Sequence, residues 1–154
     1  MRVILSGLLF LLFSSMSMGA VCEVHLEATD TGTFSKSEIT VQQACRTIML
    51  SLNHAGKLPK TAMGHNWVLS KSTDVSEILS KAKAAGFANE YQFKDSSKII
   101  ASTKLLSGGE SDTITFDVSR LNSGTSYTFF CSVPGHTKMI GKFVVQDTTA
   151  RMNS

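Results

Sequence analysis

Two short segments that lie far apart in the chain carry side chains that bind soft metal ions, and a fold has to bring them together. Residues 63–67 read Met-Gly-His-Asn-Trp, and residues 131–139 read Cys-Ser-Val-Pro-Gly-His-Thr-Lys-Met. The segments offer a thiolate from Cys131, a thioether from Met139 and the imidazoles of His65 and His136. Two histidines and a cysteine in one plane, with a weak axial methionine, form a type 1 copper centre, which passes one electron at a time. The pattern therefore predicts one copper ion and redox transfer.

Each of these residues has an ordinary explanation when it is taken alone. A cysteine at a strand end is usually a small core residue, a single histidine usually lies at the surface, and a single methionine is usually buried. Their joint occurrence, with a second histidine beside a glycine, favours a metal site. Zinc is the main competitor, but structural zinc sites prefer four Cys or His ligands, often at paired short spacings. One cysteine, two histidines and a methionine fit that pattern poorly.

The N-terminus has the composition of an export signal. Met1 and Arg2 supply positive charge, residues 3–13 are almost entirely apolar, and residues 14–20 are mostly small or polar. The apolar run is too short to span a membrane, which takes about 20 residues. We therefore expect residues 1–20 to be a signal peptide that is cleaved after Gly19 or Ala20. A periplasmic location without stable membrane association follows, and an uncleaved anchor is the alternative.

The rest of the chain has the composition of one globular domain. The chain has 154 residues, of which 42% are hydrophobic and 18% are charged, and this length suits a single domain. We assign the domain to residues 21–146 and expect the polar residues 147–154 to form a flexible tail. Without Arg2 the chain has 14 Lys and Arg against 12 Asp and Glu, scattered along the sequence. Since nucleic-acid binding needs a basic patch, no nucleic-acid partner is expected.

The three cysteines indicate one disulfide and one unusual thiol. In an oxidising compartment cysteines normally pair, so either one stays free or two chains are linked. Cys22 and Cys45 flank a strand-turn-strand pattern near the N-terminus, whereas Cys131 stands in the cluster of histidine and methionine. The economical assignment pairs Cys22 with Cys45. Copper would then protect the thiol of Cys131.

Short runs rich in β-branched and aromatic residues, separated by Gly, Asn, Asp and Ser, predict a mostly β protein. The expected strands, about eight in number, cover residues 21–28, 39–41, 47–52, 67–69, 99–103, 113–118, 126–131 and 142–145. Residues 74–85 have helical spacing instead, with Asp74 as the expected N-cap and Gly86 as the stop. The apolar stripe of this helix should face the core and comprises Val75, Ile78, Leu79 and Ala82. Tyr127 is either part of a tyrosine corner, a Greek-key feature, or a simple strand residue.

Three blocks of the sequence resemble the azurins, which are bacterial blue copper proteins with the cupredoxin fold. The blocks are residues 58–70, 115–121 and 129–136, and the resemblance extends over about residues 21–146. It implies an all-β, eight-stranded Greek-key β-sandwich or barrel with one external α-helix near residues 74–85. The placement of Cys22 and Cys45 also matches the disulfide of that family.

The resemblance also implies roles for individual residues. Three would be equatorial copper ligands, namely His65, Cys131 and His136. The carbonyl of Gly64 would lie on one axial side and Met139 on the other. Asn66 would join the two ligand loops and hold the surroundings of the cysteine sulfur, as outer residues of metal sites do. His54 matches a buried histidine of the family, which we interpret as a core residue without a redox role, and His25 is interpreted as structural or surface.

One feature departs from the azurin pattern. Azurins typically have three residues between the loop histidine and the axial methionine, whereas only Thr137 and Lys138 separate His136 from Met139. The thioether of Met139 could therefore lie at a changed distance from the copper, or the carbonyl oxygen of Gly64 could contribute more to axial ligation. Since the axial ligand tunes the reduction potential, the sequence does not predict that potential.

The function predicted from these residues is that of an electron carrier rather than an enzyme. Electrons would leave through His136, and an apolar patch around it would comprise Met63, Val133, Pro134 and Gly135, with the charge of Lys138 beside them. Such a patch suits brief docking with redox proteins such as c-type cytochromes or reductases. Lys138 favours partners with acidic rims. The alternative is periplasmic copper sequestration or delivery, which would use the same donors.

Overall fold

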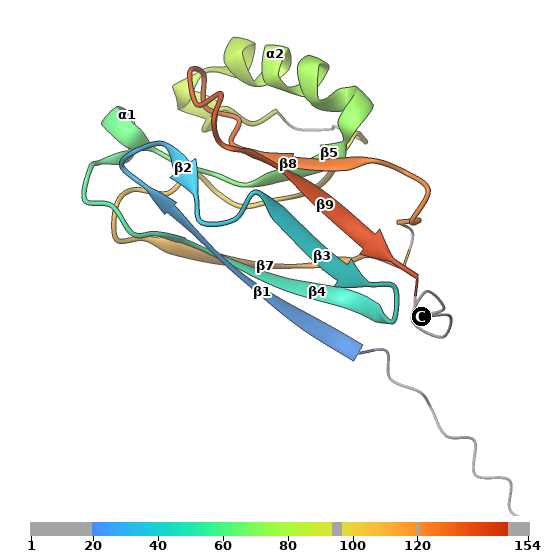
Figure 1. The fold of residues 1–154 in the computed structure, drawn as a ribbon. Coiled ribbons are helices and arrows are strands. Elements are labelled where there is room, and N and C mark those ends of the chain that lie inside the picture. Colours follow the sequence, from blue (N-terminus) through green and yellow to red (C-terminus); the bar gives the residue numbers. More distant parts are fainter. Residues whose placement is uncertain (1–19, 94–96, 120, 148–154) are drawn as a thin grey trace, which may run out of the picture.

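The computed structural model describes residues 20–93, 97–119 and 121–147, and in these residues two β-sheets pack face to face (Figure 1). The four-stranded sheet has the order β2 (Thr33–Phe34), β1 (Ala20–Thr29), β4 (Cys45–His54) and β7 (Ser111–Asp117). The five-stranded sheet has the order β3 (Glu38–Gln42), β9 (Ile140–Gln146), β8 (Tyr127–Phe130), β5 (Val68–Lys71) and β6 (Ile99–Ser102). The predicted all-β sandwich is confirmed, and all eight predicted strands are present. The sequence does not predict β2, because two residues are too few to show an alternation.

The pairing of the strands brings the two ligand segments to one end of the sandwich. Strands β5 and β8 are antiparallel neighbours, with Val68 opposite Phe130. The residues just before β5 therefore lie beside the residues just after β8, although they are distant in sequence. Strands β1 and β4 run parallel, and Ala28 of β1 lies opposite His54 of β4. The C-terminal ends of these two strands therefore lie side by side in the four-stranded sheet. The metal-binding segments thus share an end of the fold by topology.

A tightly packed core supports this end of the molecule. In β4 successive side chains point alternately into the space between the two sheets and away from it. The inward side chains of Ile48, Leu50 and Leu52 are completely buried. Trp67 packs between the sheets, with its ring centroid 5.9 Å from Phe116. Because protein interiors are packed as densely as organic crystals, the adjoining loops stand on a rigid base.

The predicted external helix is α2 (Val75–Ala85), which lies outside the five-stranded sheet (Figure 1). Ile78 and Ala82 are buried as expected, but Leu79 is 36% exposed, so the prediction that the whole apolar stripe faces the core is wrong for that residue. Gly86 ends the helix with a φ of 71°, as predicted. Asp74 precedes the helix but makes no capping hydrogen bond with its side chain. The predicted N-cap position of Asp74 is confirmed, but its carboxylate pairs with Lys98 at 3.5 Å instead of capping the helix.

Three shorter helical segments complete the described part of the chain. They are α1 (Lys60–Met63) and the 3-10 turns η1 (Ser72–Asp74) and η2 (Phe87–Asn89). The sequence does not predict α1, since four residues cannot show a helical period. No helix of the described residues is long and apolar enough to cross a membrane.

Tyr127 forms a tyrosine corner. Its hydroxyl oxygen accepts a hydrogen bond of 3.2 Å from the backbone N–H of Asn122, five residues upstream. Such a contact fixes the corner that leads into a strand of a Greek-key sandwich. Of the two interpretations of Tyr127, the structure supports the corner.

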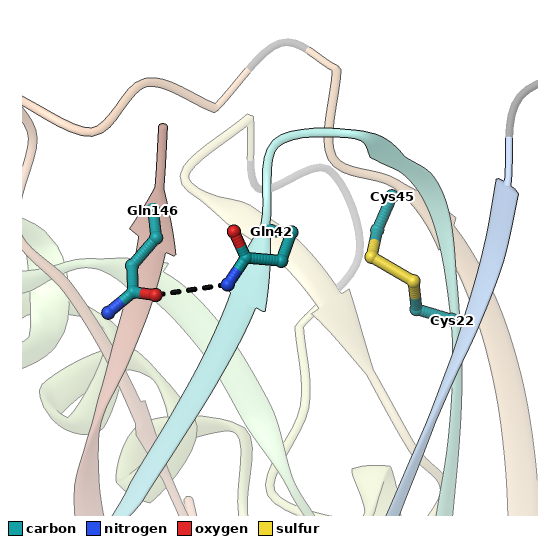
Figure 2. The surroundings of a disulfide bond; sticks show 4 residues. All are labelled: Cys22, Gln42, Cys45 and Gln146. Carbon is teal, nitrogen blue, oxygen red and sulfur yellow. Dashed lines mark hydrogen bonds between the residues drawn. A yellow bond between two sulfur atoms is a disulfide. The ribbon is translucent and has the colours of Figure 1, made fainter. Parts of the chain in front are cut away.

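The predicted disulfide joins Cys22 of β1 to Cys45 at the start of β4 (Figure 2). Beside it, the side chains of Gln42 and Gln146 hydrogen bond at 3.0 Å and connect β3 to β9. The predicted signal peptide, residues 1–20, lies outside the described residues except for Ala20, which begins β1. Of the expected tail, only Asp147 is described, and it accepts a hydrogen bond from Ser123.

Candidate metal centre

His65 lies in the connection between α1 and β5, and its backbone is fixed by a neighbouring segment. The N–H of His65 donates to the carbonyl of Leu106 at 3.1 Å, and the N–H of Leu106 donates to the carbonyl of His65 at 2.8 Å. Just before it, Gly64 lies so close to α1 that an added Cβ would stand 2.6 Å from the carbonyl oxygen of Lys60. Only glycine therefore fits without a shift of the backbone.

The imidazole of His65 is held so that one ring nitrogen is available. Its Nε2 lies 2.8 Å from the carbonyl oxygen of Thr29. A carbonyl oxygen can only accept, so Nε2 carries the proton in the neutral ring and Nδ1 has a free lone pair. In the described residues, two buried side-chain polar atoms lack a partner, namely Nδ1 of His65 and Nε1 of Trp67. Of these, only the imidazole nitrogen can bind a metal.

The second ligand segment follows β8 and folds back on itself. The N–H of Cys131 donates to the carbonyl of Met139 at 3.0 Å, and the N–H of Met139 donates to the carbonyl of His136 at 2.9 Å. Gly135 has a φ of 90°, a backbone conformation that favours glycine and turns the loop. As a result, Nδ1 of His136 stands 3.5 Å from Sγ of Cys131.

The loops bring three donor atoms together. The ligand atoms of His65, Cys131 and His136 all lie within 4.8 Å of one another. The side chains of His65 and Cys131 are buried, whereas His136 is half-buried and extends to the surface. The geometry brings together a sulfur and two nitrogens, the donor types that suit copper.

Burial determines the protonation of these groups. It lowers the pKa of His65 to about 4, and desolvation likewise lowers the pKa of His136. Burial also raises the pKa of the Cys131 thiol to about 11, although the backbone N–H groups of Asn66 and Val133 act in the opposite direction. At neutral pH without a metal, the site therefore holds two neutral imidazoles and a neutral thiol. All three are disposed to bind a cation that displaces the thiol proton.

His54 is completely buried beside the site but is not available as a fourth ligand. Its ring stacks on His65 with centroids 4.5 Å apart. One ring nitrogen, Nε2, donates to the carbonyl of Met63 at 2.7 Å, and the other, Nδ1, accepts from the N–H of Gly56 at 3.1 Å. Both nitrogens are thus used, and a closed zinc site of four Cys and His ligands cannot form from these residues. The predicted burial of His54 is confirmed, and His25 is exposed beside Glu23.

The shortened loop still directs Met139 inward. Met139 is 1% exposed, whereas its neighbour Ile140 is 49% exposed. Met139 also lines the same groove as Cys131 and His136. The missing residue between His136 and Met139 has thus not turned the thioether to the surface. Axial ligation by Met139 and by the carbonyl of Gly64 stays a prediction.

Asn66 connects the two ligand segments through its side chain. Its Nδ2 donates to Oγ of Ser132 at 2.7 Å, and its Oδ1 accepts from the N–H of Ser132 at 2.8 Å. Both residues are buried next to ligands, since Asn66 follows His65 and Ser132 follows Cys131. The expected link between the two loops is therefore present.

The surface around His136 is a groove of about 330 Å³ between α2 and the 131–139 loop. Its walls include Val133, Pro134 and Gly135 from the predicted patch, and Leu79, Lys83 and Ile140, which sequence reasoning missed. Met63 and Lys138 do not line it: Met63 is half-buried in the other ligand segment, and Lys138 is exposed beside the groove. In the described part of the chain, no acidic side chain lines the groove.

Sequence reasoning also missed the residues that orient the ligands through their backbone. Thr29 and Leu106 act on His65 through carbonyl and N–H groups, which every residue type offers. No sequence signal could have identified them. The sequence gives only a weak indication of a role for Ser132, namely that this residue directly follows the cysteine ligand.

Known proteins resemble the chain along almost all of its described length. A family model described as copper binding proteins, plastocyanin/azurin family, matches residues 20–146. The azurin of Pseudomonas chlororaphis is 48% identical over 126 residues, which cover 82% of this chain and 98% of that protein. The azurin of Bordetella pertussis is 44% identical over 136 residues, with 88% and 91% covered. The solved azurin Az-iso2 of the methylotroph Methylomonas sp. strain J matches with a TM-score of 0.77 at 38% identity, covering 81% of this chain and 98% of that chain.

Proposed function

Since this chain belongs to the plastocyanin/azurin family of copper-binding proteins, it is a type 1 copper electron carrier, and we propose that His65, Cys131 and His136 hold its one copper ion. The bound ion supplies a one-electron couple between Cu(I) and Cu(II). Azurin-like cupredoxins carry electrons and are not enzymes. The observation that carries the ligand proposal is the convergence of three donor atoms within 4.8 Å, with Nδ1 of His65 left without a partner.

The role of the protein around the site is to keep the ligands in place. The carbonyl of Thr29 fixes the ring of His65, and the side chain of Asn66 fixes Ser132 beside Cys131. Outer contacts of this kind orient metal ligands and set their basicity. Little of the protein then has to move when an electron arrives or leaves, which makes transfer fast.

Electrons pass through the exposed side of His136, where partners dock on the groove. His136 is half-buried, whereas His65 is completely buried. Lys83 at the groove and Lys138 beside it supply positive charge, and neither makes an ion pair among the described residues. Redox proteins with acidic rims, such as c-type cytochromes or reductases, fit this surface, because opposite charges speed association.

The protein acts in the periplasm, with residues 1–20 as its export signal. The support is the disulfide between Cys22 and Cys45, which persists in an oxidising compartment such as the periplasm. A buried free thiol at Cys131 in the same chain fits a metal ligand that copper protects.

Burial of the ligands favours a carrier over a copper-delivery protein. His65 is 0% exposed and Cys131 is 3% exposed, so copper could leave only if the loops opened. The test is to mix copper-loaded protein with a reduced c-type cytochrome in one stopped-flow experiment and with a strong copper chelator in another. A carrier exchanges electrons at about 10⁵ M⁻¹s⁻¹ or faster. It loses copper to the chelator much more slowly than it exchanges electrons with the cytochrome. Copper transfer to the chelator that outpaces electron transfer would establish delivery instead.

A further inference from the structure

The turn between η2 and β6 contains two adjacent residues in an unfavourable conformation. Glu90 and Tyr91 have φ angles of 54° and 53°, and they are the only non-glycine residues with positive φ in the described part of the chain. A Cβ makes this left-handed region unfavourable, so such residues persist only where their surroundings hold them. The contacts of both residues lead to the ligand loops.

Glu90 holds the two segments that flank His65. Its carboxylate pairs with Nζ of Lys60 at 2.9 Å and accepts from the N–H of Leu105 at 3.4 Å. Lys60 begins α1, which ends just before Gly64 and His65. Leu105 precedes Leu106, whose backbone pairs with that of His65. One side chain therefore connects both supports of this ligand.

Tyr91 reaches the other ligand loop through its backbone. Its carbonyl oxygen accepts a hydrogen bond of 2.8 Å from Oγ of Ser132. The same hydroxyl accepts from Nδ2 of Asn66 at 2.7 Å, so Ser132 uses its oxygen as donor and acceptor at once. The backbone N–H groups of Asn66 and Val133 act on the sulfur of Cys131. The Tyr91 carbonyl thus completes the hydrogen bonds that fix the surroundings of the thiol.

We propose that the Glu90–Tyr91 turn is a positioning element that holds the two ligand loops at a fixed separation, with the hydroxyl of Ser132 as its link to Cys131. Adjacent residues of the turn address different loops, Glu90 the loop of His65 and Tyr91 the loop of Cys131. Neither residue is a metal ligand, so both act through other residues. The part of the proposal that concerns bound copper rests on the copper site proposed above.

The experiment compares Glu90→Ala and Ser132→Ala with the control Glu77→Ala. Glu77 pairs with Lys81 and Lys98 at the surface of α2, so the control removes a paired carboxylate away from the loops. In metal-free protein we measure the rate at which Cys131 reacts with a small disulfide reagent. Each test variant removes two hydrogen bonds. Because the loss of even one corresponds to a roughly fivefold change, both variants should react at least about five times faster than wild type. The control should react at the wild-type rate.

Copper-loaded samples give a second readout. The visible thiolate-to-copper band and the copper hyperfine splitting should shift in Glu90→Ala and Ser132→Ala. The variant Ser132→Thr keeps the hydroxyl, so its band and its splitting should match those of wild type. Glu77→Ala should leave them unchanged.

The proposal is overturned if folded Glu90→Ala and Ser132→Ala match the control in thiol reactivity and spectrum. If Ser132→Ala does not fold, Glu90→Ala alone tests the proposal, because the side chain of Glu90 is 40% exposed and can be truncated without leaving a buried cavity. Wild-type protein that takes up no copper would contradict the proposed function, but the thiol rates would still test the turn.

Discussion

The ring of His65 faces the metal centre through Nδ1 because its Nε2 donates to the carbonyl oxygen of Thr29 at 2.8 Å. This contact selects one tautomer of the neutral imidazole, and it is made by a backbone group at the end of β1. The ligand is therefore oriented before a metal arrives. Only the thiol of Cys131 has to change protonation when copper binds.

Copper binding should release about one proton per ion at pH 7. The pKa of Cys131 is raised to about 11, so its thiol holds a proton that copper must displace, whereas the lowered pKa of His65, about 4, leaves that ring neutral. The apparent affinity should therefore rise about tenfold per pH unit above neutrality. A pH-stat titration of metal-free protein measures the release, and Cys131→Ser should release none. Zero release from wild type would mean that the thiolate already exists.

Met139→Leu should raise the reduction potential and shift the visible spectrum, while Ile140→Leu should leave both unchanged. The thioether of Met139 is buried beside the ligands, whereas Ile140 is 49% exposed. Removal of a sulfur donor disfavours the more positive Cu(II), and the axial ligand is a known determinant of potential. Cyclic voltammetry of both copper-loaded variants makes the comparison. Equal potentials for Met139→Leu and wild type would show that the short loop keeps the thioether away from copper.

Lys83→Glu and Lys138→Glu should each slow electron exchange with an acidic c-type cytochrome by roughly tenfold at low salt. Lys83 is exposed in the wall of the groove, and Lys138 is exposed beside it in the loop of His136. Lys71→Glu is the matched control. Lys71 of β5 lies opposite Tyr127 in the sheet, at the end of β8 that is remote from Cys131. Stopped-flow rates at several salt concentrations provide the measurement. If Lys71→Glu slows electron exchange as much as the test variants do, the effect comes from the net charge of the protein and not from docking at the groove.

Replacement of both Cys22 and Cys45 by alanine should lower the free energy of unfolding by about 3 kcal/mol without a change in the copper spectrum. The disulfide closes a loop with a sequence separation of 23 residues. It lies at the start of β4, whereas His54 stands beside the site at the other end of that strand. Urea unfolding and a visible spectrum check the two statements. An altered spectrum would reveal coupling along the strand.

The fold could be predicted because its signals are local. The strands have alternating or β-branched sequences, and Gly86 ends α2 where the backbone takes a positive φ, which favours glycine. The disulfide followed from the location of Cys131 in the metal cluster. The errors arose where tertiary contacts override local preference: Lys98 takes the side chain of Asp74 from the helix terminus, and Leu79 faces the groove instead of the core.

The candidate site was predictable only in its side chains. Cys131, His136 and His65 carry recognisable chemistry, and the structure brings their donor atoms together. The groups that orient them are carbonyls and N–H groups of Thr29, Leu106 and Tyr91, and these have no residue-specific signal. Likewise, the groove depends on the packing of α2 against the loop, which periodicity does not determine.

Addition of Cu(II) to the mature, metal-free protein, followed by visible and electron spin resonance spectra, tests the copper site most directly. We expect one copper per chain and an intense thiolate-to-copper charge-transfer band that disappears in Cys131→Ser. A colourless protein that takes up zinc only would contradict the account.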